Sequence, residues 1–307
     1  MRRILLSLVL LLAVLGLGAW ATLTFAPGRV VALTEWMQAR GAGMEAKVIE
    51  TATGPVHYYE GGEGPVIVML HGMADAKASF LGAAAELTGT HRVILPDMAN
   101  HGENPRGDAA DGTITAQVAH VDALADALGL ESFDLAGNSM GGHTAAAYAI
   151  LHPGRVRALI LVNAAGLAVE GHEVYAGLAP IETEEQFDAV MARVLVNPPS
   201  VPGPVKRHLM DTANADLPLV NAMAEAIRDD PLYDLSDRLD AIAAPTLVLW
   251  GQEDAVVPLE VGQRYAEGIE GAIYEPLPGA GHSPQLEQAE TVGRAIAAFL
   301  DETEGRQ

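Results

Sequence analysis

Cysteine is absent from this chain of 307 residues. Its absence excludes disulfide bonds, metal sites built on thiolates, cysteine nucleophiles and the lipidated cysteine of a bacterial lipoprotein. Internal repeats are also absent, and no low-complexity tract occurs outside the N-terminal segment. Half of the residues are hydrophobic, so a chain of this length can bury the core of one large domain, with or without an insertion.

Basic residues are scarce. Eighteen lysines and arginines stand against forty acidic residues, which gives a formal charge of −22. A field of this sign repels nucleic acid and anionic surfaces, and it favours neutral or cationic substrates. We therefore expect no nucleic-acid partner.

The N-terminus carries a long apolar run. Arg2 and Arg3 precede an uncharged stretch over residues 4–25, which ends before Pro27. As a helix this stretch would span about 33 Å, enough to cross a bilayer. Residues 1–28 are therefore predicted to form a membrane anchor. The arginines favour a cytosolic N-terminus with the rest of the chain outside the cytoplasm, on the periplasmic side if the protein is bacterial.

A cleaved signal peptide is the alternative for the same segment. Ala19-Trp20-Ala21 has the small-x-small form of a cleavage site, so the protein would be secreted after cleavage near Ala21. Residues 29–44 are expected either to lie along a membrane interface or to pack on the domain surface.

From residue 45 onward, predicted strands alternate with predicted helices. The strands are expected at 47–51, 56–60, 66–70, 92–95, 133–136, 159–162, 246–250 and 272–275, and the helices near 75–88, 115–129, 140–152, 258–268 and 284–301. The middle strands are apolar throughout, which is typical of a parallel sheet covered by helices on both faces. The first two strands alternate more and are predicted to form an antiparallel edge.

Residues 164–244 interrupt this alternation with helical segments and a proline-rich stretch. Five apolar side chains recur at helical spacing and make one apolar helix face: Phe187, Val190, Met191, Val194 and Leu195. The chain is therefore expected to have a core over residues 45–163 and 245–307, with residues 164–244 inserted as a helical lid.

The sequence Gly137-Asn138-Ser139-Met140-Gly141 stands between a predicted strand and a predicted helix. The pattern G-x-S-x-G in this context is a nucleophile elbow, a tight turn that presents a serine at the edge of the sheet. The small residues two positions before and after the serine are what such a turn requires. Ser139 is the predicted nucleophile.

A serine hydroxyl needs a base, and the base needs an orienting acid. Asp254 and His282 each follow a predicted strand, in the chain order serine, acid, histidine. The ends of parallel strands meet at one sheet edge, so the three residues are expected to converge there. Glu253 is the weaker choice of acid, because adjacent side chains point in different directions.

The negative oxygen formed during attack requires two backbone donors. These are predicted to be the N–H groups of Met140, directly after the serine, and of Met73, in the loop after the third strand. His71 is expected to hydrogen-bond this loop. A metal site on Asp97 and His101 is a weak alternative, and no cofactor or metal is predicted.

These motifs, in this order, resemble the α/β-hydrolase superfamily over residues 45–301. Within it the chain is most similar to the membrane-anchored monoacylglycerol lipase branch and related bacterial lipases, on the N-terminal run, the elbow and the lid segment. The resemblance implies a mostly parallel eight-stranded sheet and an esterase or lipase that acts on neutral lipids such as monoacylglycerols, through an acyl-enzyme on Ser139. The loop after His71-Gly72 lacks the aromatic residue that is commoner in the family.

Three other functions are compatible with parts of this pattern. Carbon–carbon hydrolases of aromatic ring-cleavage products share the elbow but commonly carry tryptophan after the histidine, where this chain has Ser283. A cofactor-free haloperoxidase-type hydrolase and a non-enzymatic binding protein are the others. Epoxide hydrolases and haloalkane dehalogenases use an aspartate where this chain has Ser139, so their chemistry is excluded. The sequence predicts no particular oligomeric state.

Overall fold

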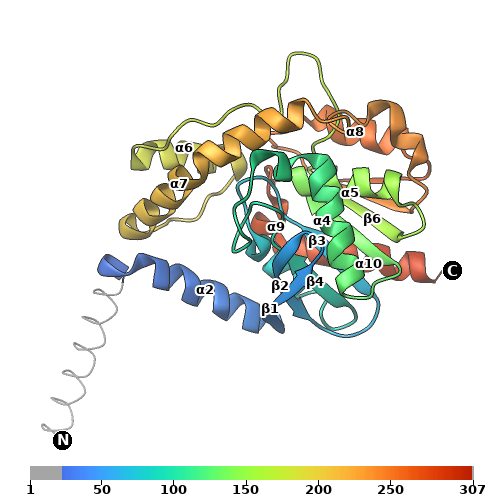
Figure 1. The fold of residues 1–307 in the computed structure, drawn as a ribbon, viewed down its shortest axis with the longest axis horizontal. Coiled ribbons are helices and arrows are strands. Elements are labelled where there is room, and N and C mark those ends of the chain that lie inside the picture. The colour runs from blue at the N-terminus through green and yellow to red at the C-terminus, as the bar shows by residue number, and fades with distance from the viewer. Residues whose placement is uncertain (1–22, 306–307) are drawn as a thin grey trace, which may run out of the picture.

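The computed structural model describes residues 23–305, and its central element is one eight-stranded sheet with the order β1-β2-β4-β3-β5-β6-β7-β8 (Figure 1). From β4 onward neighbouring strands run parallel, whereas β1 pairs with β2 and β2 pairs with β4 in antiparallel fashion. The predicted antiparallel edge is therefore confirmed. The strands are β1 (Met44–Thr51), β2 (Gly54–Gly61), β3 (Val66–Leu70), β4 (Arg92–Pro96), β5 (Phe133–Asn138), β6 (Val156–Val162), β7 (Thr246–Gly251) and β8 (Ile273–Leu277).

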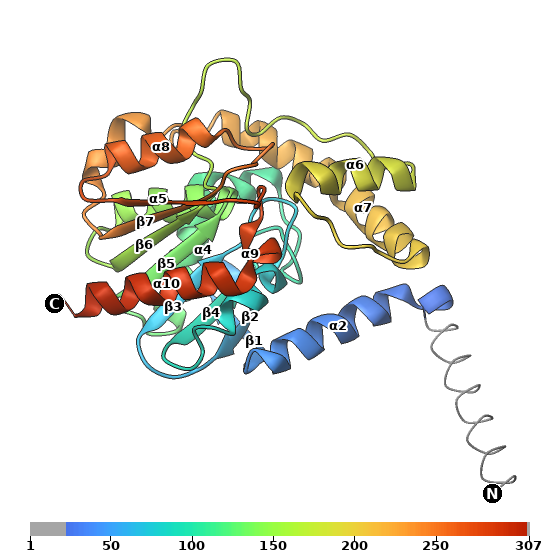
Figure 2. The same cartoon turned by 180° about the vertical axis from the view of Figure 1, so that it is seen from behind.

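Helices cover both faces of the sheet, and this arrangement confirms the predicted layers (Figures 1 and 2). One face packs on α4, α5 and α8, and the other on α3 and α10. The helices are α2 (Pro27–Gly41), α3 (Leu81–Ala84), α4 (Ile114–Ala127), α5 (Met140–Leu151), α6 (Glu184–Val194), α7 (Gly203–Arg228), α8 (Leu259–Gly268), α9 (Pro284–Glu287) and α10 (Ala289–Glu304), with 3₁₀ turns η1 (Lys77–Phe80), η2 (Ala109–Gly112) and η3 (Ser236–Ala241).

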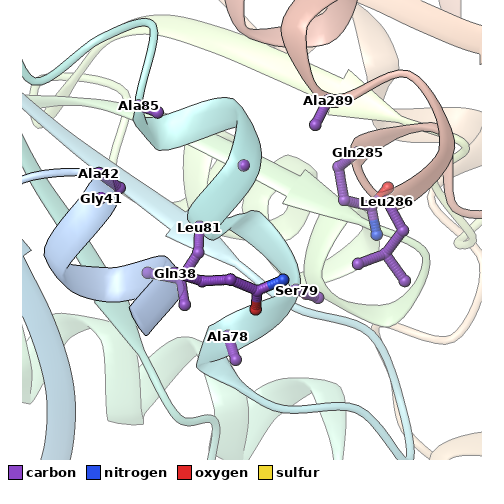
Figure 3. Close-up of a pocket in the computed structure, with 11 residues that line it drawn as sticks. Gln38, Gly41, Ala42, Ala78, Ser79, Leu81, Ala85, Gln285, Leu286 and Ala289 are labelled. Atoms are coloured by element: carbon purple, nitrogen blue, oxygen red, sulfur yellow. The ribbon is translucent and has the colours of Figure 1, made fainter. Parts of the chain in front are cut away.

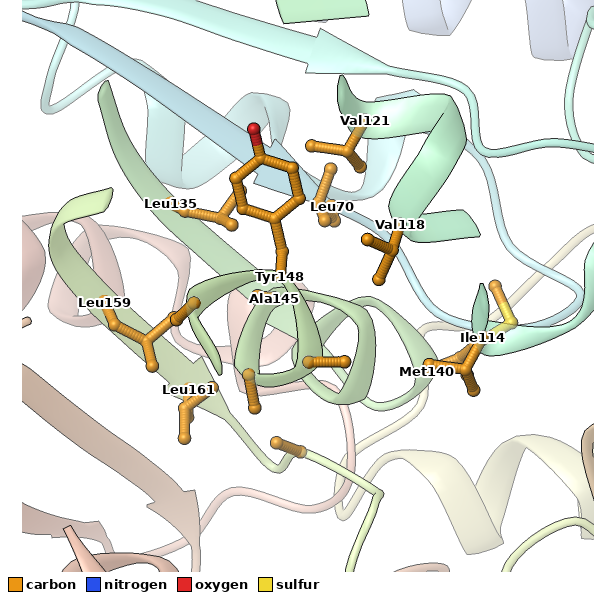
Figure 4. Packing of buried hydrophobic residues seen from close by; sticks show 14 of the residues in the cluster. Leu70, Ile114, Val118, Val121, Leu135, Met140, Ala145, Tyr148, Leu159 and Leu161 are labelled. Atoms are coloured by element: carbon orange, nitrogen blue, oxygen red, sulfur yellow. The ribbon is translucent and has the colours of Figure 1, made fainter. Parts of the chain in front are cut away.

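Alternate side chains of each central strand enter opposite cores. Leu135 of β5 faces the α4–α5 side, where Tyr148 is buried, and its neighbour Ala136 belongs to the core on the other face. Figure 4 shows the Leu135 side chain beside the Tyr148 ring. Because both faces are buried, strands apolar at every position are the ones that fit the middle of this sheet.

The long segment between β6 and β7 holds α6, α7 and η3, and it contains no named strand. The two views agree that α6 lies beside α7 at one end of the molecule (Figures 1 and 2). Of the predicted apolar face, Phe187 and Leu195 are buried, whereas Val190 is 43% exposed. That this segment works as a lid stays a prediction.

Helix α2 packs on the surface of the domain, against β1, α3 and α7. Ala39 is buried, and the Tyr59 hydroxyl of β2 donates to Glu35 Oε1 at 2.9 Å. Trp36 and Met37 lie on the outside and are more than half exposed. The surface-packing alternative for this segment is therefore confirmed.

The predicted membrane-anchored localisation has to be corrected. Within residues 23–305 no helix is both long and apolar enough to cross a bilayer. Helix α2 has 15 residues, which rise only about 22 Å, and it carries Arg29, Glu35 and Arg40. Residues 4–22 of the predicted span, and the predicted cleavage near Ala21, lie outside the described residues.

The helix predicted near residues 75–88 is instead a 3₁₀ turn followed by one turn of α-helix, η1 and α3. Lys77 explains this local geometry. Its Nζ contacts Asp97 Oδ2 at 2.6 Å and Glu103 Oε2 at 2.5 Å, and its backbone N–H donates to Asp97 Oδ1. The segment is therefore fastened to the loop after β4 by a buried ion pair that the helical pattern of the sequence does not reveal.

Lys77→Ala is expected to lower the free energy of unfolding by about 3–5 kcal/mol, because it leaves the Asp97 carboxylate buried without its cation. The side chain of Lys77 is 3% exposed and that of Asp97 is fully buried. Lys47→Ala is the control: its 2.8 Å pair with Glu60 has a lysine that is 43% exposed, so the loss should stay within about 1 kcal/mol. Equal losses in urea unfolding would contradict this account.

Candidate active site

Ser139 occupies a strained backbone position between β5 and α5, with φ 54° and ψ −119°. A non-glycine residue in this region costs on the order of 1–3 kcal/mol. The strain is tolerated because the backbone crowds closely around the turn. A Cβ on Gly137 would collide with the Gly141 carbonyl, and a Cβ on Gly141 would collide with the Leu70 carbonyl. The predicted need for glycine at both positions thus has a direct structural cause.

Asp254 and His282 lie beside each other, as predicted from their places after β7 and β8. His282 Nδ1 is 2.8 Å from Asp254 Oδ2, and both side chains are almost fully buried. Asp254 Oδ1 accepts hydrogen bonds from the backbone N–H groups of Val256 and Val257, at 2.7 and 2.9 Å. The carboxylate is thereby fixed in an orientation that holds the imidazole. Glu253, the rejected alternative, accepts a hydrogen bond from the Gly279 N–H instead.

Asn163 is a site residue that sequence reasoning missed. Its Nδ2 donates to Asp254 Oδ2 at 2.7 Å, and its Oδ1 accepts from the Gly251 N–H at 3.0 Å. The residue directly follows β6 and has φ 44°. The sequence places Asn163 directly after a strand that ends at the same sheet edge, and this position could have indicated a role in the site. No motif marks the residue. Asn163 joins the ends of β6 and β7 and orients the acid.

The backbone around His282 is held from two sides. Asn138, next to the elbow serine, donates from Nδ2 to the His282 carbonyl at 2.9 Å. From the inserted segment, the Val194 carbonyl accepts from the His282 N–H at 2.8 Å. Glu287 adds a second link, because it accepts from the N–H groups of Gly281 and Asn197 at 2.7 and 2.9 Å. The histidine loop is therefore bonded both to the sheet edge and to the inserted segment.

The loop after β3 lies against the elbow. Gly72 lies so close to the elbow that a Cβ on it would stand 3.2 Å from Ser139 Cβ. Met73 is the next residue in the chain after this contact. Met140 begins α5, where the first backbone N–H groups have no partner within the helix. These placements suit the predicted pair of donors, whose role stays a prediction.

His71 fixes the shape of this loop, as expected. Its Nε2 accepts the Met98 N–H at 2.9 Å, so its Nδ1 is the donor to the Gly72 carbonyl at 2.7 Å. Burial lowers the pKa of His71 to about 3, which keeps the ring neutral. Of the two residues in the weak metal hypothesis, Asp97 pairs with Lys77 and His101 faces the Ala99 carbonyl. Residues 23–305 contain no cluster of three or more metal-ligating side chains.

A serine at an elbow and a carboxylate–imidazole pair at the same sheet edge are the parts needed for nucleophilic acyl transfer. Within residues 23–305, no hydrogen bond joins the Ser139 hydroxyl to the imidazole, whereas the Asp254–His282 bond is formed. Catalytic hydrogen bonds of this kind often tighten only when substrate is bound. The roles of Ser139, Asp254 and His282 stay predictions at this point.

Comparison with known proteins agrees with this geometry. The family model for the alpha/beta hydrolase fold matches residues 65–289. The chain belongs to the alpha/beta hydrolase family. Lipase 3 of Moraxella sp. (strain TA144) is 28% identical over 84% of this chain and 85% of its own length.

Two further similarities are informative. The 2-hydroxymuconate semialdehyde hydrolase of Pseudomonas putida is 31% identical, over 80% of this chain and 90% of its own length. The crystal structure of a membrane phospholipase A, described as a bacterial virulence factor, superposes with a TM-score of 0.85 and 31% identity, over 99% of both chains. The similar proteins thus include a lipase, a phospholipase A and a hydrolase of 2-hydroxymuconate semialdehyde.

Asn163→Ala should lower kcat/KM for a soluble ester by about tenfold to a hundredfold, the equivalent of about 1.5–3 kcal/mol for a hydrogen bond to a carboxylate. Asn221→Ala provides a matched control, since its amide also makes two hydrogen bonds, both of them to the backbone of Leu178 in the inserted segment. Steady-state kinetics of both purified variants would check this. If both lost activity equally, Asn163 would have no particular role in orienting the acid.

Proposed function

We propose that the protein is a serine carboxylic-ester hydrolase that acts on neutral acyl lipids such as monoacylglycerols. The observation that carries this proposal is the 2.8 Å pair of His282 Nδ1 and Asp254 Oδ2 at the sheet edge where the strained Ser139 stands. An aligned base is what a weakly acidic hydroxyl needs in order to attack an ester.

In the first step the Ser139 hydroxyl attacks the ester carbonyl while His282 Nε2 accepts its proton. Asp254, hydrogen-bonded to Nδ1, stabilises the imidazolium that forms. The N–H groups of Met73 and Met140 stabilise the negative oxygen of the tetrahedral intermediate. The imidazolium then protonates the leaving alcohol, the carbon–oxygen bond of the substrate breaks, and the acyl group remains on Ser139.

In the second step water attacks the acyl-enzyme. His282 accepts a proton from the water and passes it to Ser139 Oγ, so the bond to the serine breaks and a carboxylic acid leaves. Every proton in the two steps moves through one imidazole. The proposed mechanism therefore requires no cofactor and no metal.

The relatives and the composition of the chain support a lipid substrate. Lipases stand among the relatives, and the superposition with the phospholipase A covers nearly the whole of both chains. The excess of acidic residues disfavours anionic substrates. The inserted residues 164–244, which bury Phe187 and Leu195, would act as the lid over an acyl chain.

Carbon–carbon bond hydrolysis of aromatic ring-cleavage products is the second candidate, because one superposed structure is named a meta-cleavage product hydrolase and several relatives are named as hydrolases of 2-hydroxy-6-oxo dienoates or of 2-hydroxymuconate semialdehyde. Ser283 follows His282 here, and the carbon–carbon hydrolases commonly have tryptophan at that place. The lipid ester is therefore preferred.

The wild type should hydrolyse monooleoylglycerol and p-nitrophenyl esters, and a fluorophosphonate probe should label it. Ser139→Ala should abolish the labelling and lower kcat by about 10⁴-fold or more, because the nucleophile is lost. Ser132→Ala, an exposed serine before β5, should keep both the labelling and the activity.

Labelling that survives Ser139→Ala would overturn the assignment of the nucleophile. The same assay should include 2-hydroxymuconate semialdehyde beside the esters. If kcat/KM for this substrate exceeded that for every ester, the second candidate would replace the first.

A further inference from the structure

The inserted segment leaves the sheet after β6 and returns to it before β7. We call its two ends the stems: residues 164–175 form the first stem and residues 228–236 the second. The stems lie side by side, because the Leu235 N–H of the second donates to the Gly166 carbonyl of the first at 2.9 Å. A group that holds both stems therefore sets the position of the inserted segment on the core.

His143 of α5 is such a group. Its Nδ1 lies 2.8 Å from the Tyr175 hydroxyl of the first stem, and its Nε2 lies 2.7 Å from the Leu232 carbonyl of the second. A carbonyl can only accept, so Nε2 carries the hydrogen and Nδ1 accepts from the Tyr175 hydroxyl. Burial lowers the pKa of His143 to about 4, which keeps the ring neutral at neutral pH. One imidazole thus bonds a different stem with each of its nitrogens.

The surroundings of the His143 ring exclude water. His143 is fully buried, and Tyr175 is only 4% exposed. Gly166 of the first stem packs so closely that a Cβ on it would stand 2.5 Å from His143 Cδ2. Because a buried polar group that loses its partner is costly, both nitrogens of the ring favour the arrangement in which the stems are in place.

His143 also lies on the first turn of the helix that follows the nucleophile. Its backbone N–H donates to the Ser139 carbonyl at 2.9 Å. The Ala165 N–H of the first stem donates to the same carbonyl at 3.0 Å. The nucleophile and the stems of the inserted segment are therefore held by one turn of α5.

Other attachments of the inserted segment are more exposed to water. Arg264 of α8 is partly exposed and donates to the Ala168 carbonyl and the Ser236 hydroxyl of the stems. Arg106 pairs with Asp216 of α7 through side chains that are 34% and 41% exposed, and such pairs contribute little. Among the described residues, none of the inserted segment lines the groove of about 260 Å³ between α2, η1–α3 and α9–α10 (Figure 3). That groove does not hold the inserted segment.

We propose that His143 is a positioning residue that holds the inserted segment over the acyl site and thereby sets the preference for long acyl chains. This inference rests on the proposed function, in which residues 164–244 cover the acyl chain. A long acyl group would contact the inserted segment, whereas an acetyl group would stay beside Ser139. A weaker hold on the stems should therefore weaken the binding of long esters and spare the reaction of short ones.

The test is Tyr175→Phe, which removes one hydroxyl and leaves the aromatic ring. Its KM for p-nitrophenyl decanoate should rise by about fivefold to tenfold, the loss expected when one buried hydrogen bond no longer favours the closed position. Its kcat for this ester, and its kcat/KM for p-nitrophenyl acetate, should stay within about twofold of the wild type, because Ser139, Asp254 and His282 keep their contacts.

Substitutions of His143 itself provide a second, graded series. His143→Leu removes both hydrogen bonds and should raise the KM for the decanoate further than Tyr175→Phe does. His143→Gln should recover part of this loss, because its amide nitrogen can still donate to the Leu232 carbonyl.

Tyr148→Phe is the matched control. Tyr148 lies on the same helix and is fully buried, and its hydroxyl donates to Asp122 Oδ1 of α4 at 2.9 Å (Figure 4). Its loss should leave the preference between the two esters unchanged. Hydrogen–deuterium exchange gives a readout that does not depend on catalysis: exchange of the two stems should be faster in Tyr175→Phe and unchanged in Tyr148→Phe.

An unchanged preference between the two esters in Tyr175→Phe would overturn the inference. An equal loss for both esters, or the same shift of preference in Tyr148→Phe, would overturn it as well. A wild type that hydrolyses neither ester would instead overturn the proposed function. Hydrogen–deuterium exchange would then still show whether His143 holds the stems.

Discussion

The backbone packing around residues 137–141 is the constraint on which the rest of the site depends. The turn at Ser139 has a positive φ, and it is kept there because the start of α5 presses against the carbonyl groups that end β3. Gly137 and Gly141 permit this approach, since any side chain at either position would meet backbone. The same contact sets the Met73 loop against the serine. The close packing of the end of β3 against the start of α5 therefore positions both the nucleophile and its expected oxyanion donors.

The hydrogen bonds of the histidine loop extend this constraint to the other strand ends. Asn138 ties the loop to the elbow, and Asn163 ties the acid to the end of β7. The inserted segment is bonded to the same loop through Val194 and Glu287. A movement of the inserted segment at this point would thus disturb the position of the imidazole. If the inserted segment opens to admit substrate, the parts of it that are farther from residues 194–197 can move without breaking these hydrogen bonds.

The parts of the fold and of the site that the sequence predicts are those that depend on a local pattern of residues. The strand over 66–70 and the antiparallel edge follow from apolar runs and alternation, and the elbow follows from its glycines. Asp254 and His282 are predictable because the ends of parallel strands share one edge of the sheet. Asn163 and Glu287 act through partners about 90 residues away in the chain, which a single sequence does not reveal. The prediction of a helix near 75–88 is wrong for a similar reason. The contact of Lys77 with Asp97 outweighs the local helix propensity.

The central claim is that an acyl group passes through Ser139. It is tested most directly by quenching the reaction with monooleoylglycerol during turnover and measuring the mass of the intact protein and of its peptides. The account predicts one oleoyl group on the peptide that contains Ser139, which disappears as substrate is exhausted and never forms on Ser139→Ala. Turnover of the ester with no adduct, or with an adduct on another residue, would contradict it.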